Sequence, residues 1–220
     1  MRDFSFRRVI VVEYEAPGQV STVRDGESRI QVRAARPEDA HHVARLVLLS
    51  AAELLPGIFG PGIQRALADM AAGRGTLFSH QHAWIAEEDA EVRGMLLGYS
   101  GAVKAAQDPR TGLALLGSLR AEMIRRLPNL LRMQSAIGHI GREEYYLSNV
   151  AVYPGHQGKG IGSLLVGRAR QEAQRAGLSF LVLDVETDNP GAQRLYQRLG
   201  FRVVSRTPEL VVRGHPFSFL

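Results

Sequence analysis

The chain has 220 residues, of which 45% are apolar and 22% charged, a balance typical of a globular protein with one sizeable core. It contains no cysteine, which excludes disulfides, thiol nucleophiles and thiolate metal ligands. No apolar run approaches the length that crosses a membrane, and the run at 9–12 is too short for the core of a signal peptide. We therefore expect no membrane partner and a cytoplasmic protein.

The formal net charge of +5 at pH 7 raises the question of a nucleic-acid partner. Lysine occurs only at Lys104 and Lys159, so the basic residues are almost all arginines, and they are spread along the chain without a clustered arm. Nucleic-acid-binding segments usually combine such a cluster with stacking aromatic side chains. We expect no nucleic-acid partner, and only modest help from the excess charge in holding an anionic ligand.

Residues 1–28 carry no motif and are expected to form an N-terminal extension, either with an edge strand around 8–14 or partly disordered. A short alternating strand over 30–33 follows. The next segment, 37–55, is predicted to be a helix, because proline and acidic residues occupy its first turn. The breaker Pro56-Gly57 is expected to end it.

A second helix is predicted over about 63–72, after another Pro-Gly breaker. Residues 83–87 and 93–99 are rich in apolar residues and flank the acidic turn 88–91, so they predict a β-hairpin.

The segment 100–142 is expected to be an extra helical insert. Apolar residues recur at helical spacing from Leu115 to Leu131, opposite several arginines, and Pro128 is expected to break or kink the helix. A packed helix with a solvated arginine face is the simplest interpretation. The alternatives are a lid over a binding site and a contact between the two copies of a homodimer.

The next strand, 145–152, leads into a glycine-rich turn. Tyr-Pro-Gly at 153–155 ends the strand, and Gln-Gly-Lys-Gly-Ile-Gly at 157–162 leads directly into a helix that ends near Gly177. Backbone N–H groups at a helix start are unpaired and glycines let an anion approach them, so this turn suits a phosphate or pyrophosphate. The glycine and lysine spacing fits neither a Walker loop nor the dinucleotide fingerprint.

Residues 178–185 form an almost continuous apolar run, as expected of a strand buried on both faces. Asn189 and Pro190 then provide a helix start, with a capping side chain followed by proline. Gly200 stops this short helix, and residues 201–204 predict one more strand.

Together, the Gln-x-x-Gly-x-Gly turn between a strand and a helix, and the later Asn…Tyr…Gly-Phe segment, resemble the acetyl-CoA-binding half of the GNAT superfamily of N-acetyltransferases. The match covers about 145–206, and Arg-Pro-Glu-Asp-Ala after the opening strand extends it weakly toward the N-terminus. The resemblance implies an α/β fold with a mixed, mostly antiparallel twisted sheet flanked by helices, and with the helical insert of about 100–142 before the central strand. A single GNAT acetyltransferase domain is expected over 29–220.

The resemblance also implies a function. Acetyl-CoA would be the acyl donor co-substrate, and an amine of a small molecule, peptide or protein would attack it directly in a ternary complex. The cleft is expected where the strand 145–152 diverges from its parallel neighbour 180–185. The residues that the resemblance assigns to the cofactor are Val150, Ala151, Val152, Gln157, Gly158, Lys159, Gly160, Ile161, Gly162, Ser163, Asn189 and Tyr196.

The same resemblance suggests the catalytic groups. Tyr196 occupies the position of the family's usual general acid, and a phenol with an ordinary pKa of about 10 can protonate a departing thiolate at neutral pH. Some members carry a glutamate base where this chain has Tyr146. Glu144, on the same strand face, is the candidate base here, although a solvated strand-end carboxylate explains it equally well. Water relayed by Glu144 or Ser148 is a further alternative.

Seven histidines invite a metal hypothesis, but the tightest pair, His80 and His82, has no third ligand at a recognisable spacing, so no metal is expected. A different class of function also fits the glycine turn: a non-catalytic acyl-CoA-binding module, acting as a sensor or a regulator, would not need Tyr196. A longer acyl donor and another acceptor nucleophile stay open within the enzyme class.

Overall fold

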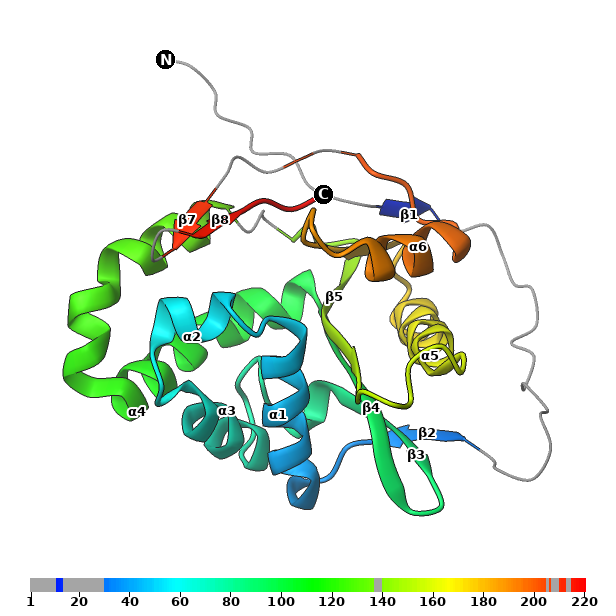
Figure 1. Cartoon of the computed structure of the whole chain (residues 1–220), viewed down its shortest axis with the longest axis horizontal. Coiled ribbons are helices and arrows are strands. Elements are labelled where there is room, and N and C mark those ends of the chain that lie inside the picture. The colour runs from blue at the N-terminus through cyan, green and yellow to red at the C-terminus, as the bar shows by residue number, and fades with distance from the viewer. Residues whose placement is uncertain (1–10, 14–29, 137–139, 205, 207–209, 213–214) are drawn as a thin grey trace.

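The computed structural model describes residues 11–13, 30–136, 140–204, 206, 210–212 and 215–220. Most of the expected N-terminal extension, and the side chains of the second half of the helical insert, therefore lie outside the described residues. One six-stranded sheet has the order β1-β6-β5-β4-β3-β2 (Figure 1). Only β5 and β6 are parallel, and the other neighbours are antiparallel, which confirms the predicted mixed, mostly antiparallel sheet.

The strands of the sheet are β1 (Val11–Glu13), β2 (Gln31–Ala34), β3 (Ala83–Glu88), β4 (Glu91–Ser100), β5 (Glu144–Val152) and β6 (Phe180–Leu183). The helices are η1 (Pro37–Asp39), α1 (Ala40–Ser50), α2 (Leu54–Phe59), α3 (Ile63–Ala72), η2 (His80–His82), α4 (Gly101–Ala136), α5 (Ile161–Arg175) and α6 (Pro190–Arg198). A separate two-stranded sheet contains β7 (Leu210–Val212) and β8 (His215–Phe217).

Helices cover both faces of the sheet, α5 one face and α1 and α3 the other (Figure 1). Strand β4 shows why, since successive side chains of a strand point to opposite faces. Met95 and Leu97 pack into the cluster that includes α1 and α3, whereas Leu96 packs into the cluster that includes α5. All three side chains are fully buried, so the central strands have two apolar faces.

The predicted hairpin is confirmed as β3 and β4. Its central turn residues, Asp89 and Ala90, both have positive φ, as a type I′ two-residue turn requires. The second predicted helix, 63–72, coincides with α3.

The first predicted helix is wrong at its end. Helix α1 stops at Ser50, where Ala51 leaves the helical region, and a separate helix α2 begins at Leu54. Pro56, expected to break the helix, lies in the first turn of α2, where a missing backbone N–H removes no helical hydrogen bond. Gly60, with φ of 88°, follows α2 instead.

The insert is one helix, α4, assigned continuously through Pro109 and Pro128, so Pro128 does not break the helix, and a kink there stays a prediction. Figure 1 shows that the ribbon of α4 changes direction along its length before it reaches the β7–β8 hairpin. Leu115 and Leu119 join the core cluster that contains α2 and α3, as their spacing predicted. Leu116, placed on the same apolar face by that spacing, is 46% exposed.

Two glycines close the insert at its base. A Cβ atom on Gly101, the first residue of α4, would overlap the carbonyl group of Gly141, just before β5. We call Gly101 and Gly141 the neck of the insert. The two backbones pack directly against each other because Gly101 carries no side chain, while a Cβ atom on Gly141 would crowd the side chain of Glu144.

The predicted strand 201–204 is also wrong. Among the described residues no strand is assigned there, and Val203 and Val204 are 47% and 54% exposed. The position beside the continuation of β6 belongs to the last residues of the sequence. Leu220 N donates to Val185 O at 2.9 Å, and Thr187 N donates to Ser218 O at 2.9 Å. None of the described helices combines the length and the apolar character that crossing a membrane would need.

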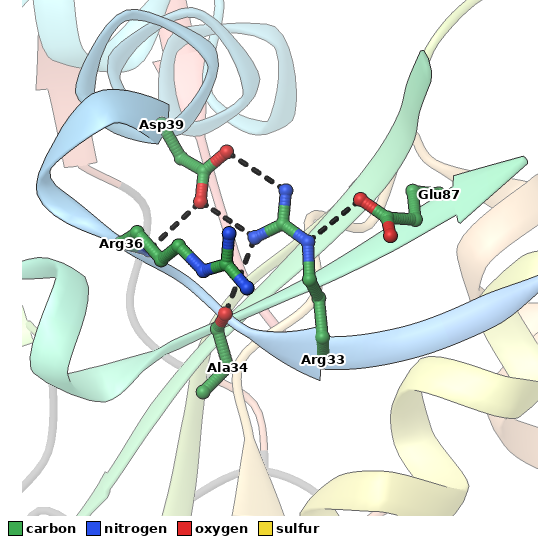
Figure 2. A network of polar contacts seen from close by, with 5 residues as sticks. All are labelled: Arg33, Ala34, Arg36, Asp39 and Glu87. Atoms are coloured by element: carbon green, nitrogen blue, oxygen red, sulfur yellow. Dashed lines mark hydrogen bonds and ion pairs between the residues drawn. The ribbon is translucent and has the colours of Figure 1, made fainter. Parts of the chain in front are cut away.

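An ion-pair network joins β2, β3 and the start of α1 (Figure 2). The Arg33 guanidinium donates to both carboxylate oxygens of Asp39, at 2.7 and 3.0 Å, and its Nε donates to Glu87 at 2.6 Å. The backbone N–H of Arg36 also donates to Asp39, at 2.7 Å. Burial alone raises the pKa of Asp39, but the hydrogen bonds from Arg33 and Arg36, with the charge of Arg33, outweigh it and lower the pKa.

We therefore expect Asp39→Asn to lower the free energy of unfolding at pH 7 by about 2 kcal/mol, because the half-buried guanidinium of Arg33 loses one of its two charged partners. A lowered carboxyl pKa stabilises the fold above the unfolded-state value of about 3.9 and ceases to do so as the pH falls through the folded-state value. Urea unfolding of wild type and variant at pH 7 and pH 3 measures both effects. The exposed neighbour Glu38→Gln is the control, and equal midpoints for Asp39→Asn and Glu38→Gln would contradict the expectation.

Candidate active site

The parallel pair β5 and β6 opens in the middle of the sheet. The two strands pair from Glu144 and Phe180 to Leu147 and Leu183, and β5 then continues to Val152 without a pairing partner on β6. The predicted divergence of these strands is thus present. Main-chain groups on the open edge of β5 are left for a ligand, because a strand edge carries unpaired N–H and C=O groups.

A β-bulge explains why the strands part. Leu97 of β4 pairs with Asn149, whereas the next residue, Gly98, pairs with Leu147, so Ser148 is an extra residue in β5. Such an insertion bends its strand and increases the local twist. The bulge lies at the point where pairing with β6 ends, and it turns the second half of β5 away from β6.

The glycine-rich turn follows β5 directly. Three glycines, Gly155, Gly158 and Gly160, have φ of 86°, 78° and 81°, and no atom lies within 4 Å of where their Cβ atoms would be. The side chain of Gln157 donates to the carbonyl oxygen of Val152 at 3.1 Å, which fixes the turn to the end of the strand. The turn is therefore open on its outer side and held at its base.

Helix α5 begins in this turn without a side-chain cap. Its N-cap residue is Gly160, which has no side chain to cap the helix. No acidic residue lies in the first turn. The first backbone N–H groups of a helix have no intrahelical acceptor, and the helix dipole favours negative charge there. The predicted residues Gln157 to Ser163 thus form a single turn that fits a pyrophosphate, and their contact with CoA stays a prediction.

Two further contacts anchor the site. The Tyr153 hydroxyl, at the start of the turn, lies 2.9 Å from His42 Nδ1 on α1. At the other end, a Cβ atom on Gly162 would lie 3.0 Å from the Leu195 side chain, so α5 and α6 pack closely there. The turn is held between α1 and α6 as a result.

Tyr196 lies on α6 and is 7% exposed. It packs edge to face on Phe201, with ring centroids 5.4 Å apart, in the cluster that also holds Leu147 and Leu183. Burial raises the pKa of Tyr196 above its usual range, so the phenol is protonated at neutral pH. The position suits the predicted proton donor, a role that stays a prediction.

Asn189 is the N-cap of α6, and its amide oxygen accepts from Ala192 N at 3.0 Å. This confirms the predicted cap, whereas its contact with a cofactor is untested. Glu144 lies at the other end of the β5–β6 pairing from the opening, and its carboxylate accepts from Gly141 N at 2.6 Å. The structure gives this predicted base a role in the turn before β5.

Side chains that sequence reasoning did not select gather at the opening. The Tyr146 hydroxyl donates to Asp184 Oδ2 at 2.8 Å, and the rings of Tyr146 and Tyr99 lie 5.9 Å apart. One sequence signal could have found Asp184: it is a carboxylate directly after an apolar parallel strand, where ligands bind in open α/β sheets. Its contact with Tyr146 joins residues far apart in the chain, so no local sequence pattern could have predicted it.

The two histidines considered as metal ligands have other partners. His80 Nδ1 lies 2.8 Å from Ala71 O, and His82 Nε2 lies 2.9 Å from Gln107 Oε1. Within the described part of the chain, no three histidine, aspartate or glutamate side chains are grouped as metal ligands.

A model of the acetyltransferase (GNAT) family matches residues 53–201, more than half of the chain. The chain belongs to this family, as the resemblance implied. The chain has the GNAT fold, with its parting strands, its glycine turn and helix α5.

Among individual relatives, the L-methionine sulfoximine/L-methionine sulfone acetyltransferase of Salmonella typhimurium is 40% identical over 65 residues, which are 30% of this chain and 38% of that protein. The [ribosomal protein bS18]-alanine N-acetyltransferase of Escherichia coli is 36% identical over 66 residues, 30% of this chain and 45% of that protein. The matches thus span less than half the length of these relatives.

Solved structures share the fold over most of the chain. An N-acetyltransferase from Staphylococcus aureus Mu50 has a TM-score of 0.62 at 20% identity, covering 86% of this chain and 98% of that one. The acetyltransferase yncA of Salmonella typhimurium, solved with its cofactor acetyl-CoA, has a TM-score of 0.55 at 20% identity, covering 86% and 90%.

The open turn leads to a stability prediction. Gly160→Ala is expected to destabilise the fold by about 1–2 kcal/mol, because an alanine at φ of 81° is strained even where space is free. Gly167→Ala, inside α5 with no atom within 4 Å of its Cβ position, should instead stabilise by about 0.5–1 kcal/mol. Urea unfolding without ligand compares the two variants. The same sign for both would mean that the left-handed N-cap does not persist in solution.

Proposed function

We propose that this protein is an acetyl-CoA-dependent N-acetyltransferase. The observation that carries the proposal is the continuity of one site: strands β5 and β6 part at Ser148, and the open edge of β5 leads to an uncapped helix start in a glycine turn. A pyrophosphate fits the turn, and an extended arm fits the open strand edge through main-chain hydrogen bonds. Membership of the GNAT family supports acetyl-CoA as the ligand with this shape.

The reaction would be a direct transfer. The nitrogen of the acceptor amine forms a bond to the thioester carbonyl carbon and gives up one N–H proton to a base. The carbon–sulfur bond breaks, and the sulfur leaves as a thiolate. Main-chain N–H groups of residues 150–152 would stabilise the developing oxyanion, and Tyr196 would give its proton to the thiolate. The raised pKa of Tyr196 supports this role, since the group is present as the acid at neutral pH.

The acceptor belongs to the same proposal. Two relatives are named for the acetylation of an amino-acid analogue and of an alanine of a ribosomal protein, so small amines and peptide N-termini are the classes to test first. A cytoplasmic location and a homodimer stay predictions.

Binding of the donor tests the proposal directly. Calorimetric titration should show that wild type binds acetyl-CoA and CoA with similar affinity. ATP should bind much more weakly than either. Gly160→Glu places a carboxylate in the open space of the turn, and like charges about 4 Å apart repel by about 4 kcal/mol at an effective dielectric constant of about 20, so affinity should fall at least ~100-fold. Gly117→Glu, which adds the same charge on the exposed part of α4, is the matched control. Well-folded wild type that ignores CoA would refute the proposal.

Catalysis is tested at Tyr196. Tyr196→Phe should lower kcat about 100-fold with unchanged CoA affinity, because it removes only the proton for the thiolate. The measurement is release of free CoA thiol with a panel of amino acids, amines and short peptides. Tyr145→Phe is the matched control, since Tyr145 is a buried tyrosine of the same cluster whose hydroxyl instead donates to Gly98 O at 3.0 Å. Donor binding without turnover of any amine would favour the non-catalytic acyl-CoA-binding module.

A further inference from the structure

The opening between β5 and β6 is bordered by one residue from each strand. Leu147 and Leu183 form the last pair, so the first residues past the pairing are Ser148 on β5 and Asp184 after β6. Asp184 is half-buried, and the hydroxyl of Tyr146 donates to its carboxylate at 2.8 Å. A carboxylate is thus fixed in position at the apex of the opening.

A second tyrosine stands beside this pair. The ring of Tyr99, from β4, lies 5.9 Å from that of Tyr146. Burial, as the largest cause, and the charges of Asp108 and Asp184 raise the pKa of Tyr99 to about 12, although a hydrogen bond with Ser148 lowers it. Tyr99 therefore stays a neutral hydrogen-bonding group, and it lies close enough to Asp184 for that charge to affect its pKa.

The pair and the predicted acid lie on opposite faces of the sheet. Tyr99 and Tyr146 belong to a small cluster with Val182, whereas Tyr196 belongs to the cluster of α5 with Leu147 and Leu183. Neighbouring residues of one strand point to opposite faces, so both groups flank the same opening from different sides. Acyl transfer to an amine involves two proton transfers, one from the amine and one to the sulfur, and two groups on different sides of the opening can each serve one of them.

We propose that Asp184 is the catalytic base for the acceptor amine and that Tyr146 is its positioning residue. The inference rests on the proposed acetyl transfer. As the nitrogen–carbon bond forms, an N–H proton passes to an Asp184 oxygen. The carbon–sulfur bond breaks with its electron pair on sulfur, and Tyr196 supplies the proton there. Solvent then returns the proton from Asp184 to Tyr196.

Glu144 is the competing base. It lies at the far end of the β5–β6 pairing, and its carboxylate already accepts the N–H of Gly141. Asp184 directly follows the last β5–β6 pair, and its carboxylate accepts the hydroxyl of Tyr146 at 2.8 Å. Position therefore favours Asp184 over Glu144.

Several charged and titratable groups surround the pair in the described part of the chain. Tyr146 comes from β5 and Tyr99 from β4. Asp108 of α4 acts on Tyr99, and the ring of His82 from η2 lies 6.0 Å from that of Tyr99. Burial lowers the pKa of His82, so this imidazole is neutral at pH 7 and above.

The test is the pH dependence of kcat/KM for an amine that wild type acetylates. Asp184→Asn should lower kcat/KM about 100-fold at pH 7, because the N–H proton that leaves as the nitrogen–carbon bond forms then has no carboxylate to accept it. Tyr146→Phe should move the acidic limb of the profile to higher pH, since the carboxylate loses a hydrogen bond that favours its charged form. Asp184→Glu should recover part of the rate.

The controls separate this inference from a structural effect and from the proposed function. Asp188→Asn, an exposed acid on the same segment, should keep the wild-type profile, and CoA affinity should be unchanged in all variants. A wild-type profile in Asp184→Asn, or the expected changes in Glu144→Gln instead, would overturn the assignment of Asp184 while acetyl transfer stands. Wild type that binds no CoA, or turns over no amine, would overturn both.

Discussion

The structure depends on the separation of two parallel strands that begin as neighbours. One extra residue, Ser148, interrupts the register between β4 and β5, and from there β5 no longer pairs with β6. Each part of the site that we propose lies next to this bulge or follows from it. The open strand edge follows it, the glycine turn and α5 lie at its far end, and Asp184 borders its apex. A sheet without the bulge would satisfy its own backbone and leave nothing to a ligand.

The same opening divides the chemistry between two environments. On the α5 side, Tyr196 is enclosed by aliphatic side chains and an edge-on phenylalanine, which favours its neutral form. On the other side, Tyr99 shares a hydrogen bond with Ser148, and the Tyr146 hydroxyl donates to Asp184. One face therefore suits a group that gives up a proton, and the other suits a carboxylate that receives one. The strands β5 and β6 alone lie between Tyr196 on one face and Asp184 on the other.

Local rules predicted several short structures well. The glycine turn, the Asn189 cap with Pro190 and the β3–β4 hairpin depend on a few adjacent residues whose backbone preferences are strong. Predictions failed where tertiary packing decided. Pro56 lies in the first turn of α2 rather than ending α1. Val203 and Val204 stay exposed because 218–220 pair with the segment after β6. The Tyr146–Asp184 contact lies beyond local reasoning for the same reason: its partners meet only when β5 and β6 align.

The neck formed by Gly101 and Gly141 has a consequence for how such proteins diversify. The chain leaves the sheet at the end of β4 and returns at the start of β5 through almost the same point, because the two backbones touch there. The entropy of closing a loop grows only with the logarithm of its length, by about 0.6 kcal/mol for each doubling. The excursion between the two glycines can therefore change in length without altering the register of β4 against β5, provided that Leu115 and Leu119 keep their places in the core. Related proteins can therefore differ in the segment between the two glycines and still share the β5–β6 opening and the glycine turn.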